Sequence, residues 1–209
     1  MLTLKVKGLG LNMENSNISA LHFDHKSGLF GDYENKTDLL KISEVKNLTI
    51  IQIAKFKKSQ VNLDQIKLNN LAMPHSYPQV AYNNDLRILW TAPDTWICIS
   101  DKSSILDEIK STFNDSDFGI TDLSHSRAII QIQGEQAIDV LKKGSPLNFN
   151  SDKFDVNNCA NTTYNGINIM IDFISSKPNT FHIFSLRSFG SSFYHSITDS
   201  ALEYGFEGI

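Results

Sequence analysis

The chain has 209 residues, of which 41% are hydrophobic and 20% charged, the balance of a globular protein that can bury a core. Its formal net charge is -4, and the densest lysine cluster, Lys55, Lys57 and Lys58, is small. This composition argues against a nucleic-acid-binding surface, which needs a concentrated basic face.

The sequence gives no indication of a membrane or secreted protein. No stretch approaches the roughly 20 apolar residues needed to cross a bilayer, and the N-terminus lacks the continuous apolar region of a secretory signal. Two cysteines, Cys98 and Cys159, are too few for a disulfide framework or a metal site. Cys98 lies in the apolar run WICIS and is expected in a core as a free thiol. Because free thiols stay reduced in the cytoplasm, we expect a cytoplasmic protein.

Residues 1–46 are predicted to form a partly extended N-terminal arm. They are rich in Asn, Gly, Asp and Lys and contain few apolar anchors, which include Leu21, Phe23, Leu29 and Phe30. Such a segment cannot close a core by itself, so it is either mobile or laid over another surface. Residues 47–209 are predicted to form the folded domain.

The first half of this domain is predicted to contain two strands joined by a tight turn, with a helix on either side. The expected elements are a strand at 48–56, a short helix around 61–68, strands at 86–90 and 96–100, and a helix at 102–113. Pro93-Asp94 supplies the turn, because proline presets φ and aspartate can bond backbone amides. Asp101 is placed to cap the last helix.

The second half is predicted to repeat this order. The expected elements are a strand at 128–133, a helix at 135–143, strands near 159–164, 167–174 and 180–185, and a helix at 187–204. Asn165-Gly166 predicts a tight hairpin turn. Gly144 is expected in a left-handed cap at the end of the first of these helices, with Pro146 preventing its continuation.

The predicted fold class is α+β, built from duplicated units of strand, helix, hairpin and helix that form one domain. Antiparallel strands with helices packed on the sheet produce this class. The two halves show no sequence identity that would support the duplication. We expect them to share one core, because the only long polar segment lies at the N-terminus.

The segment TDLSHS (121–126) places Asp122, Ser124 and His125, the three side-chain types of a hydrolytic triad, within four positions. Triad members converge from separated parts of a chain. In one strand, residues 122 and 124 share a face whereas residue 125 points to the other. The strained G-x-S-x-G turn that exposes a nucleophile is missing. We therefore interpret the segment as a turn between strands, in which the Asp and Ser side chains satisfy backbone amides.

Two further motifs are too weak to define a site. His22 and His25 lie in the arm without a third ligand or helical i,i+4 spacing, so solvated histidines are expected there rather than a metal pair. Gly8 and Gly10 lack the third glycine of a dinucleotide fingerprint, and no phosphate-binding GxxxxGK[ST] motif occurs. We therefore expect no catalytic, cofactor-binding or metal-binding residue in this chain.

Only three of the nineteen basic residues are arginines, namely Arg87, Arg127 and Arg187. Each lies at the edge of a predicted strand or helix. The planar guanidinium suits partly buried pairing with carboxylates. Two interpretations remain open, a salt bridge within the domain or a contact to another subunit.

Several segments resemble the gamma subunit of heterotetrameric sarcosine oxidase. They are LWTAPDTWICI (89–99), ITDLSHSRAIIQIQG (120–134), AIDVLKKGSPLNF (137–149), NCANTTY (158–164) and FHIFSLRSFGSSFYHSI (181–197). Their order and spacing match over roughly residues 86–205, and the arm matches loosely. Ala92 replaces a usual glycine, Ser145 a usual cysteine and Ser126 a common basic residue.

The resemblance implies a fold related to the folate-binding domain of aminomethyltransferases. It also implies membership of a complex that oxidatively demethylates sarcosine to glycine, with the one-carbon unit passing to tetrahydrofolate and electrons to oxygen, giving hydrogen peroxide. In that family FAD, FMN, NAD and tetrahydrofolate belong to partner subunits. The gamma chain holds no cofactor, and its partners are the alpha, beta and delta subunits, with alpha the main contact.

The resemblance therefore predicts a subunit without catalytic residues of its own, in which His125, Arg127 or Arg187 faces a partner. The alternative is a free-standing folate-binding protein of one-carbon transfer, like a shortened aminomethyltransferase. Such enzymes are longer and place an acidic residue against the pterin and the amine, and no residue here matches that acid.

Overall fold

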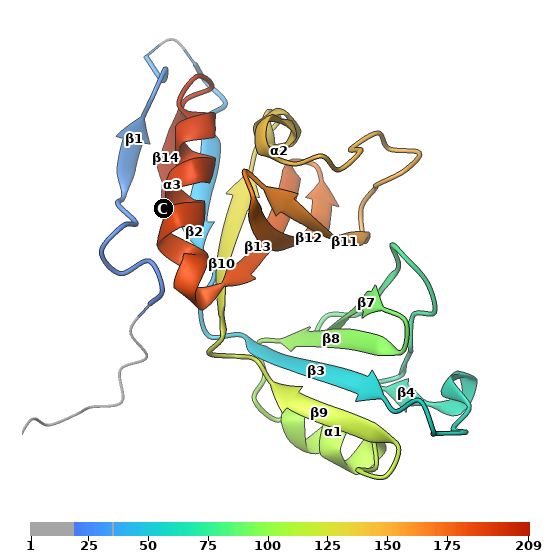
Figure 1. Ribbon diagram of the computed structural model, residues 1–209. Helices are drawn as coiled ribbons and strands as arrows, with labels where there is room; N and C mark the ends of the chain where they lie inside the picture. Colours follow the sequence, from blue (N-terminus) through green and yellow to red (C-terminus); the bar gives the residue numbers. More distant parts are fainter. Residues whose placement is uncertain (1–18, 35) are drawn as a thin grey trace, which may run out of the picture.

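The computed structural model describes residues 19–34 and 36–209 and shows a mixed α+β fold built on two β-sheets (Figure 1). The two sheets pack against each other through one face, and helices cover the outer faces. The successive layers are two helices, a seven-stranded sheet, a five-stranded sheet and a single helix. The mixed α+β class predicted from the sequence is confirmed.

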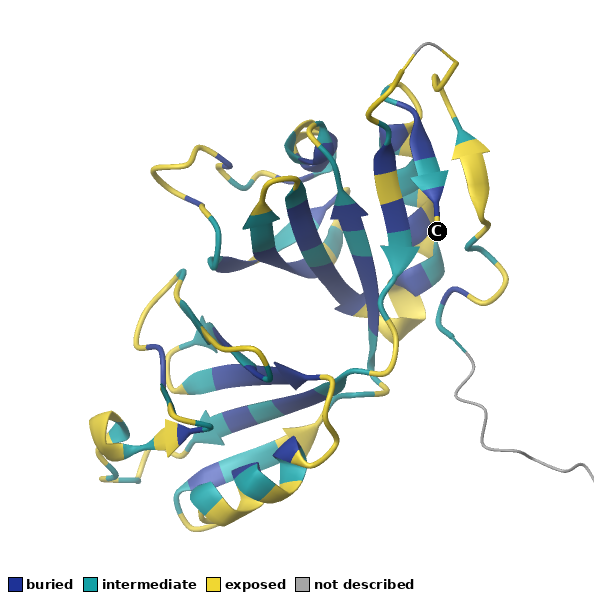
Figure 2. Ribbon diagram, turned by 180° about the vertical axis from the view of Figure 1, so that it is seen from behind, coloured by how far each residue is buried: buried dark blue, intermediate teal, exposed yellow. Residues whose placement is uncertain are grey.

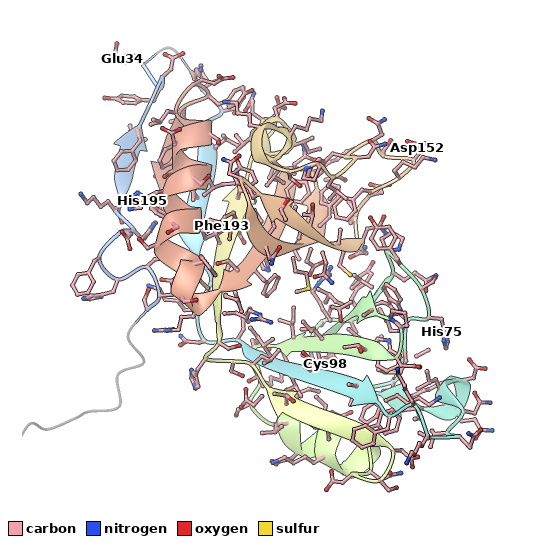
Figure 3. The ribbon with its side chains drawn as sticks, in the orientation of Figure 1. Glu34, His75, Cys98, Asp152, Phe193 and His195 are labelled. Atoms are coloured by element: carbon pink, nitrogen blue, oxygen red, sulfur yellow. The ribbon has the colours of Figure 1, made fainter. Side chains whose placement is uncertain are left out.

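Sheet A has seven strands in the order β1-β14-β2-β10-β13-β12-β11. Their bounds are Gly28–Phe30 (β1), Phe206–Gly208 (β14), Leu40–Glu44 (β2), Arg127–Gln133 (β10), Asn179–Leu186 (β13), Ile167–Ser176 (β12) and Cys159–Tyr164 (β11). The outer face is covered by α2 (Ala137–Gly144) and by α3 (Gly190–Ala201). A short 3-10 helix, η2 (Arg187–Phe189), directly precedes α3. Phe193 of α3 is fully buried in the largest core, between that helix and the sheet (Figure 3).

Sheet B has five strands in the order β6-β7-β8-β3-β9. Their bounds are Val80–Tyr82 (β6), Arg87–Ala92 (β7), Thr95–Ser100 (β8), Thr49–Lys55 (β3) and Phe118–Asp122 (β9). Helix α1 (Ile105–Thr112) packs on its outer face. A 3-10 turn, η1 (Leu63–Gln65), and a small ribbon of β4 (Lys67–Leu68) and β5 (Leu71–Ala72) also lie on this side.

The chain crosses between the two sheets at one junction, once after β2 and once after β9. Strand β2 pairs with β10 in sheet A and then leads into β3 of sheet B. Strand β9 pairs with β3 in sheet B and then leads into β10 of sheet A. The two connections lie side by side in both views (Figures 1 and 2). An edge strand of sheet B thus leads directly into β10 of sheet A, and β2 of sheet A leads directly into β3 of sheet B.

An apolar layer between the sheets holds them together. It is formed by buried side chains from both inner faces: Ile50, Leu89, Ile97 and Ile99 of sheet B, and Ile129, Cys159, Met170 and Phe184 of sheet A. Dark buried strands therefore line the space between the sheets in Figure 2. We expected one core shared by both halves. The structure instead has one core under each sheet and this third one between them, because the central strands β3, β8, β10, β12 and β13 bury residues on both of their faces.

The described part of the predicted arm packs on sheet A. Leu21, Leu40 and Ile42 are fully buried, and β1 and β2 belong to the sheet. Strand β2 is short and alternates Leu40 and Ile42 with Lys41 and Ser43, so its apolar content is low. The division at residue 46 stays a prediction, and Gly8 and Gly10 lie outside the described residues.

Several predicted elements have different bounds. The short helix around 61–68 is the 3-10 turn η1, in which Asn62 Oδ1 accepts from Asp64 N at 3.0 Å. Helix α1 begins at Ile105 after Ser104, so Asp101 does not cap it. The last helix ends at Ala201, and the chain then turns at Gly205, where φ is +72°, to form β14.

Gly144 occupies the last turn of α2 instead of the predicted left-handed cap. A Cβ at this position would lie 2.6 Å from Cε1 of the buried Tyr164 ring. The phenol of Tyr164 donates to the carbonyl of Val140 at 2.9 Å, which holds the ring against the helix. Glycine is therefore needed here for close approach rather than for a positive φ.

Candidate functional site

The segment TDLSHS forms the turn between β9 and β10, as the sequence predicts. The Asp122 carboxylate accepts from Ser124 N at 2.8 Å, and Ser124 Oγ accepts from Ile50 N at 3.0 Å. Ser126 Oγ donates to the carbonyl of Leu123 at 2.9 Å. Hydrogen bonds from Ser124 lower the pKa of Asp122. These side chains hold the turn through their hydrogen bonds. Their close spacing is therefore explained by turn formation and needs no nucleophilic role.

The three residues predicted to contact a partner line one small recess of about 100 Å³ beside this turn. His125 and Arg187 are exposed, whereas Arg127, the first residue of β10, is half-buried. The recess also contains Glu44, whose side chain is only 6% exposed. Glu44 accepts from Ser19 Oγ and lies 3.5 Å from Lys46 Nζ. The recess thus presents basic side chains at its surface, and the acid that lines it, Glu44, is already bound by Ser19 and Lys46.

A second polar group crosses between the sheets. Arg87 of β7 donates from Nε to Asp172 Oδ2 at 2.8 Å and from Nη2 to Oδ1 at 2.6 Å, a bidentate pair. Its Nη1 donates to Asn157 at 3.2 Å. The Asp172 side chain, on β12, is 1% exposed and that of Arg87 is 18% exposed. For Arg87 the interpretation as a salt bridge within the chain is confirmed.

His182 of β13 stands beside this ion pair, because it is the cross-strand partner of Asp172. Its Nε2 lies 3.0 Å from Gln131 Oε1 of the neighbouring strand β10. Burial lowers the pKa of His182, with opposing contributions from Asp172, which raises it, and Arg87, which lowers it. The histidine is therefore held in its neutral form.

This arrangement predicts a pH-dependent contribution to stability. The folded pKa of His182 lies below the ordinary value of 6.5, so the unfolded chain binds the proton more readily and stability falls as pH drops below 6.5. Between pH 7.5 and 5.5 His182 is expected to cost up to about 1.4 kcal/mol. Urea unfolding of the wild type and of His182→Gln at both pH values measures this contribution. Equal pH dependence in the two proteins would contradict it.

The opposite end of the layer between the sheets opens into a larger pocket of about 600 Å³. Its floor is the inner face of sheet A, and Ile97 of β8 contributes from sheet B. Apolar side chains dominate the lining, including Met170, Phe184 and Leu186. Arg127 lines this pocket as well as the small recess. The polar residues Asn161, Thr163 and Asn168 complete the rim, and the lining residues include no carboxylate.

Neither cysteine has the surroundings of a reactive thiol. Cys98 is fully buried in the core of sheet B (Figure 3), and burial raises its pKa well above the ordinary range. Burial also raises the pKa of Cys159 to about 12. The expectation that Cys98 is a core residue is confirmed.

The histidines of the arm are not both solvated. His22 is exposed, but His25 Nδ1 lies 2.9 Å from the Tyr194 hydroxyl and its Nε2 lies 2.9 Å from the carbonyl of Ile209. His195 of α3 pairs with Asp24 at 2.9 Å. In the described part of the chain, no group of three or more His, Cys, Asp or Glu side chains is arranged to hold a metal ion. In the same residues, no helix combines the length and apolarity that a membrane crossing requires.

Sequence reasoning missed the polar group between the sheets. Asp172, His182 and Asn157 lie in or next to apolar strands, and nothing in their local pattern indicates a common site. The one available signal is the single charge within the run NIMIDFI, since a lone carboxylate in a buried strand requires a partner. Its partner, Arg87, is separated from it by 85 positions.

Comparison with known proteins agrees with the resemblance drawn from the motifs. No protein-family model matches the chain. Two curated relatives, from Corynebacterium sp. strains U-96 and P-1, are each named sarcosine oxidase subunit gamma. The first is 24% identical over 118 residues, 56% of this chain and 57% of the relative. The second is 25% identical over 123 residues, 58% of this chain and 60% of the relative. The matches thus span less than two thirds of either relative.

Two solved structures share the fold. One chain of the heterotetrameric sarcosine oxidase from Corynebacterium sp. U-96, in complex with pyrrole 2-carboxylate, matches with a TM-score of 0.72 and 21% identity. The match covers 79% of this chain and 85% of that chain. The glycine cleavage system aminomethyltransferase T from Bartonella henselae matches with a TM-score of 0.52 and 12% identity, over 78% of this chain and 46% of that one. The predicted similarity to sarcosine oxidase gamma subunits is confirmed, and the fold is also that of an aminomethyltransferase.

Proposed function

We propose that the chain is the gamma subunit of a heterotetrameric sarcosine oxidase and performs no chemistry itself. The observation that carries the proposal is the match to one chain of such an oxidase over 79% of this chain and 85% of that one. The two curated relatives support it. The complex would oxidatively demethylate sarcosine to glycine, pass the one-carbon unit to tetrahydrofolate and give hydrogen peroxide, a role in sarcosine catabolism and one-carbon metabolism.

The proposal assigns the cofactors to the partner subunits. FAD, FMN, NAD and tetrahydrofolate would be bound by the alpha, beta and delta subunits, with alpha the main contact of this chain, in the cytoplasm. The side chains of the triad-like segment are engaged in a turn, and those of the buried group around Asp172 in an ion pair. Both arrangements support a structural role for these residues.

We place the partner contact at the basic recess beside the turn between β9 and β10. His125 and Arg187 are exposed there, and half-buried Arg127 lies behind them. Guanidinium groups suit interfaces because they form bidentate pairs with carboxylates. An acidic patch on the partner would complement this surface.

We also retain the duplicated origin of the fold as a proposal. Five neighbouring strands follow the order β6-β7-β8-β3-β9 in sheet B and β11-β12-β13-β10-β2 in sheet A. In each of these orders the fifth strand leads in the chain into the fourth strand of the other, β9 into β10 and β2 into β3. This correspondence supports duplication, although the helices of the two units differ in number and length.

Co-expression with the alpha, beta and delta subunits tests the function. We expect this chain to copurify in the assembled oxidase and to be colourless when expressed alone. A yellow, flavin-containing product with oxidase activity from the isolated chain would overturn the non-catalytic assignment. Failure to copurify with any of the three subunits would overturn the assignment as gamma subunit.

The contact surface is tested by charge reversal. His125→Glu combined with Arg187→Glu is expected to weaken association at least tenfold, because like charges would meet across the interface. Lys153→Glu, in the exposed loop before β11, is the matched control and should assemble normally. Equal association of the double variant and the control would contradict the proposed surface.

A further inference from the structure

Arg127 and Arg87 both face the layer between the sheets, but they differ in whether a carboxylate partner is present. Arg127 shares its side of β10 with Ile129, which belongs to the apolar layer. No ion pair joins Arg127 to a carboxylate in residues 19–34 and 36–209, whereas Arg87 is paired twice with Asp172. Burial lowers the pKa of Arg127, and no acid acts in the opposite direction. Within the described residues, this half-buried guanidinium therefore has no carboxylate counterion.

Two rows of cross-strand partners line the surface beside Arg127. In the first row, which is apolar except for Asn161, Ile129 faces Phe184, Phe184 faces Met170 and Met170 faces Asn161. One step further toward the open end, Arg127 faces Leu186 and Asn168 faces Thr163. Ile97 closes the pocket from sheet B. A cation thus stands at the polar end of a largely apolar pocket.

A desolvated charge without a partner is costly, and an incoming anion removes that cost. We infer that the pocket of about 600 Å³ between the sheets binds an organic acid, whose carboxylate pairs with Arg127 and whose neutral body packs on Leu186 and on the small exposed parts of Met170 and Phe184. The volume is typical of small-molecule sites, which combine apolar walls with a few polar groups. The pocket shares Arg127 with the proposed contact surface, but binding of an acid goes beyond the proposed role as a subunit and does not depend on it.

The lining also limits which acids fit. It contains no carboxylate, so an ammonium group on the ligand would have no partner, and zwitterionic amino acids are disfavoured. It contains one cation, Arg127, so a singly charged acid matches it better than a polyanion. The amide and hydroxyl groups of Asn168 and Thr163 can bond the second carboxylate oxygen or its water.

The test uses 2-naphthoate, with 2-naphthamide as a neutral molecule of nearly the same shape. Isothermal titration of the isolated chain should show saturable binding of the acid and at least tenfold weaker binding of the amide. Arg127→Met keeps an unbranched apolar stem, removes the guanidinium and its charge, and should abolish this preference for the acid. Arg187→Met, which lies outside the pocket lining, should retain it. Thermal melting checks that both variants are folded.

Each outcome decides the inference. Equal binding of acid and amide, an unchanged preference in Arg127→Met, or no saturable binding of 2-naphthoate would overturn it. Glycine, a zwitterion, should not compete. The titration is then repeated on the chain copurified with its partner subunits. Persistent binding supports a free acid as the ligand, whereas loss of the site on assembly would show that an acidic side chain of the partner fills it and would overturn the free-acid assignment.

Discussion

Replacing Arg87 with methionine is expected to lower the free energy of unfolding by about 3 kcal/mol, because it leaves the Asp172 carboxylate buried without its partner. Asp172 is 1% exposed and receives two hydrogen bonds from Arg87. The residual 18% exposure of Arg87 allows some water to reach the site, so the effect falls at the lower end of the range for buried pairs. Urea unfolding at pH 7.5 measures the difference.

The control for this prediction is the exposed pair Lys102–Asp85. Its nitrogen and oxygen lie 2.6 Å apart, but the side chains are 54% and 43% exposed. Lys102→Met should therefore change stability far less than Arg87→Met does, because water screens the exposed pair. The double variant Arg87→Met with Asp172→Leu should recover most of the loss, because no buried charge remains. A loss below 1 kcal/mol in Arg87→Met would show that the pair does not hold the sheets together.

Replacing Trp96 with alanine is expected to cost about 3 to 5 kcal/mol. The indole is 1% exposed in the core of sheet B, and its Nε1 donates to the carbonyl of Pro74 at 2.7 Å. Truncation would leave a large cavity and would strand a buried carbonyl. Trp96→Phe retains most of the packing and loses only the hydrogen bond, so a cost of about 1 to 2 kcal/mol is expected.

Chemical denaturation of these two variants beside Phe56→Ala completes the comparison. Phe56 is 45% exposed, and its removal should cost less than about 1 kcal/mol. If Trp96→Phe is as destabilised as Trp96→Ala, the hydrogen bond to Pro74 rather than packing dominates at this site. A near-neutral Trp96→Ala variant would contradict the assignment of Trp96 to the core.

The sequence predicts those parts of the fold that depend on local chemistry. The β7–β8 hairpin forms at Pro93-Asp94, where Asp94 adopts a φ of +55°. The β11–β12 hairpin forms at Asn165-Gly166, with φ of +47° and +83° as a tight primed turn requires. The strand β10 and the helix α2 lie close to their predicted ranges. Turn residues and apolar alternation are sufficient for these elements.

Elements that depend on tertiary contacts were missed. Strands β2 and β14 contain few apolar residues, and they are strands because each has neighbours on both sides in sheet A. Gly144 shows the same limit, since its role depends on the Tyr164 ring twenty positions away. A local pattern cannot reveal contacts of this kind.

The candidate site divides in the same way. The turn at Asp122 and Ser124 follows from side chains that bond neighbouring amides, so sequence reasoning reached it. The register of strands far apart in the chain pairs Arg87 with Asp172 and places Arg127 beside no carboxylate partner within the described residues. The sequence indicated that the three arginines make buried or interface contacts. Only the fold shows that Arg87 is in an ion pair, whereas Arg127 and Arg187 line a recess.

Because the chain crosses between the sheets after β2 and again after β9, neither sheet can form from one continuous segment. A ribosome that has released residues up to α1 has supplied most of sheet B but neither the strand at its β9 edge nor the central strands on which β2 rests. Few stabilising contacts are available until distant segments meet, which slows folding. Closure of both sheets is therefore a late step for the nascent chain, and strand edges stay unpaired until it occurs.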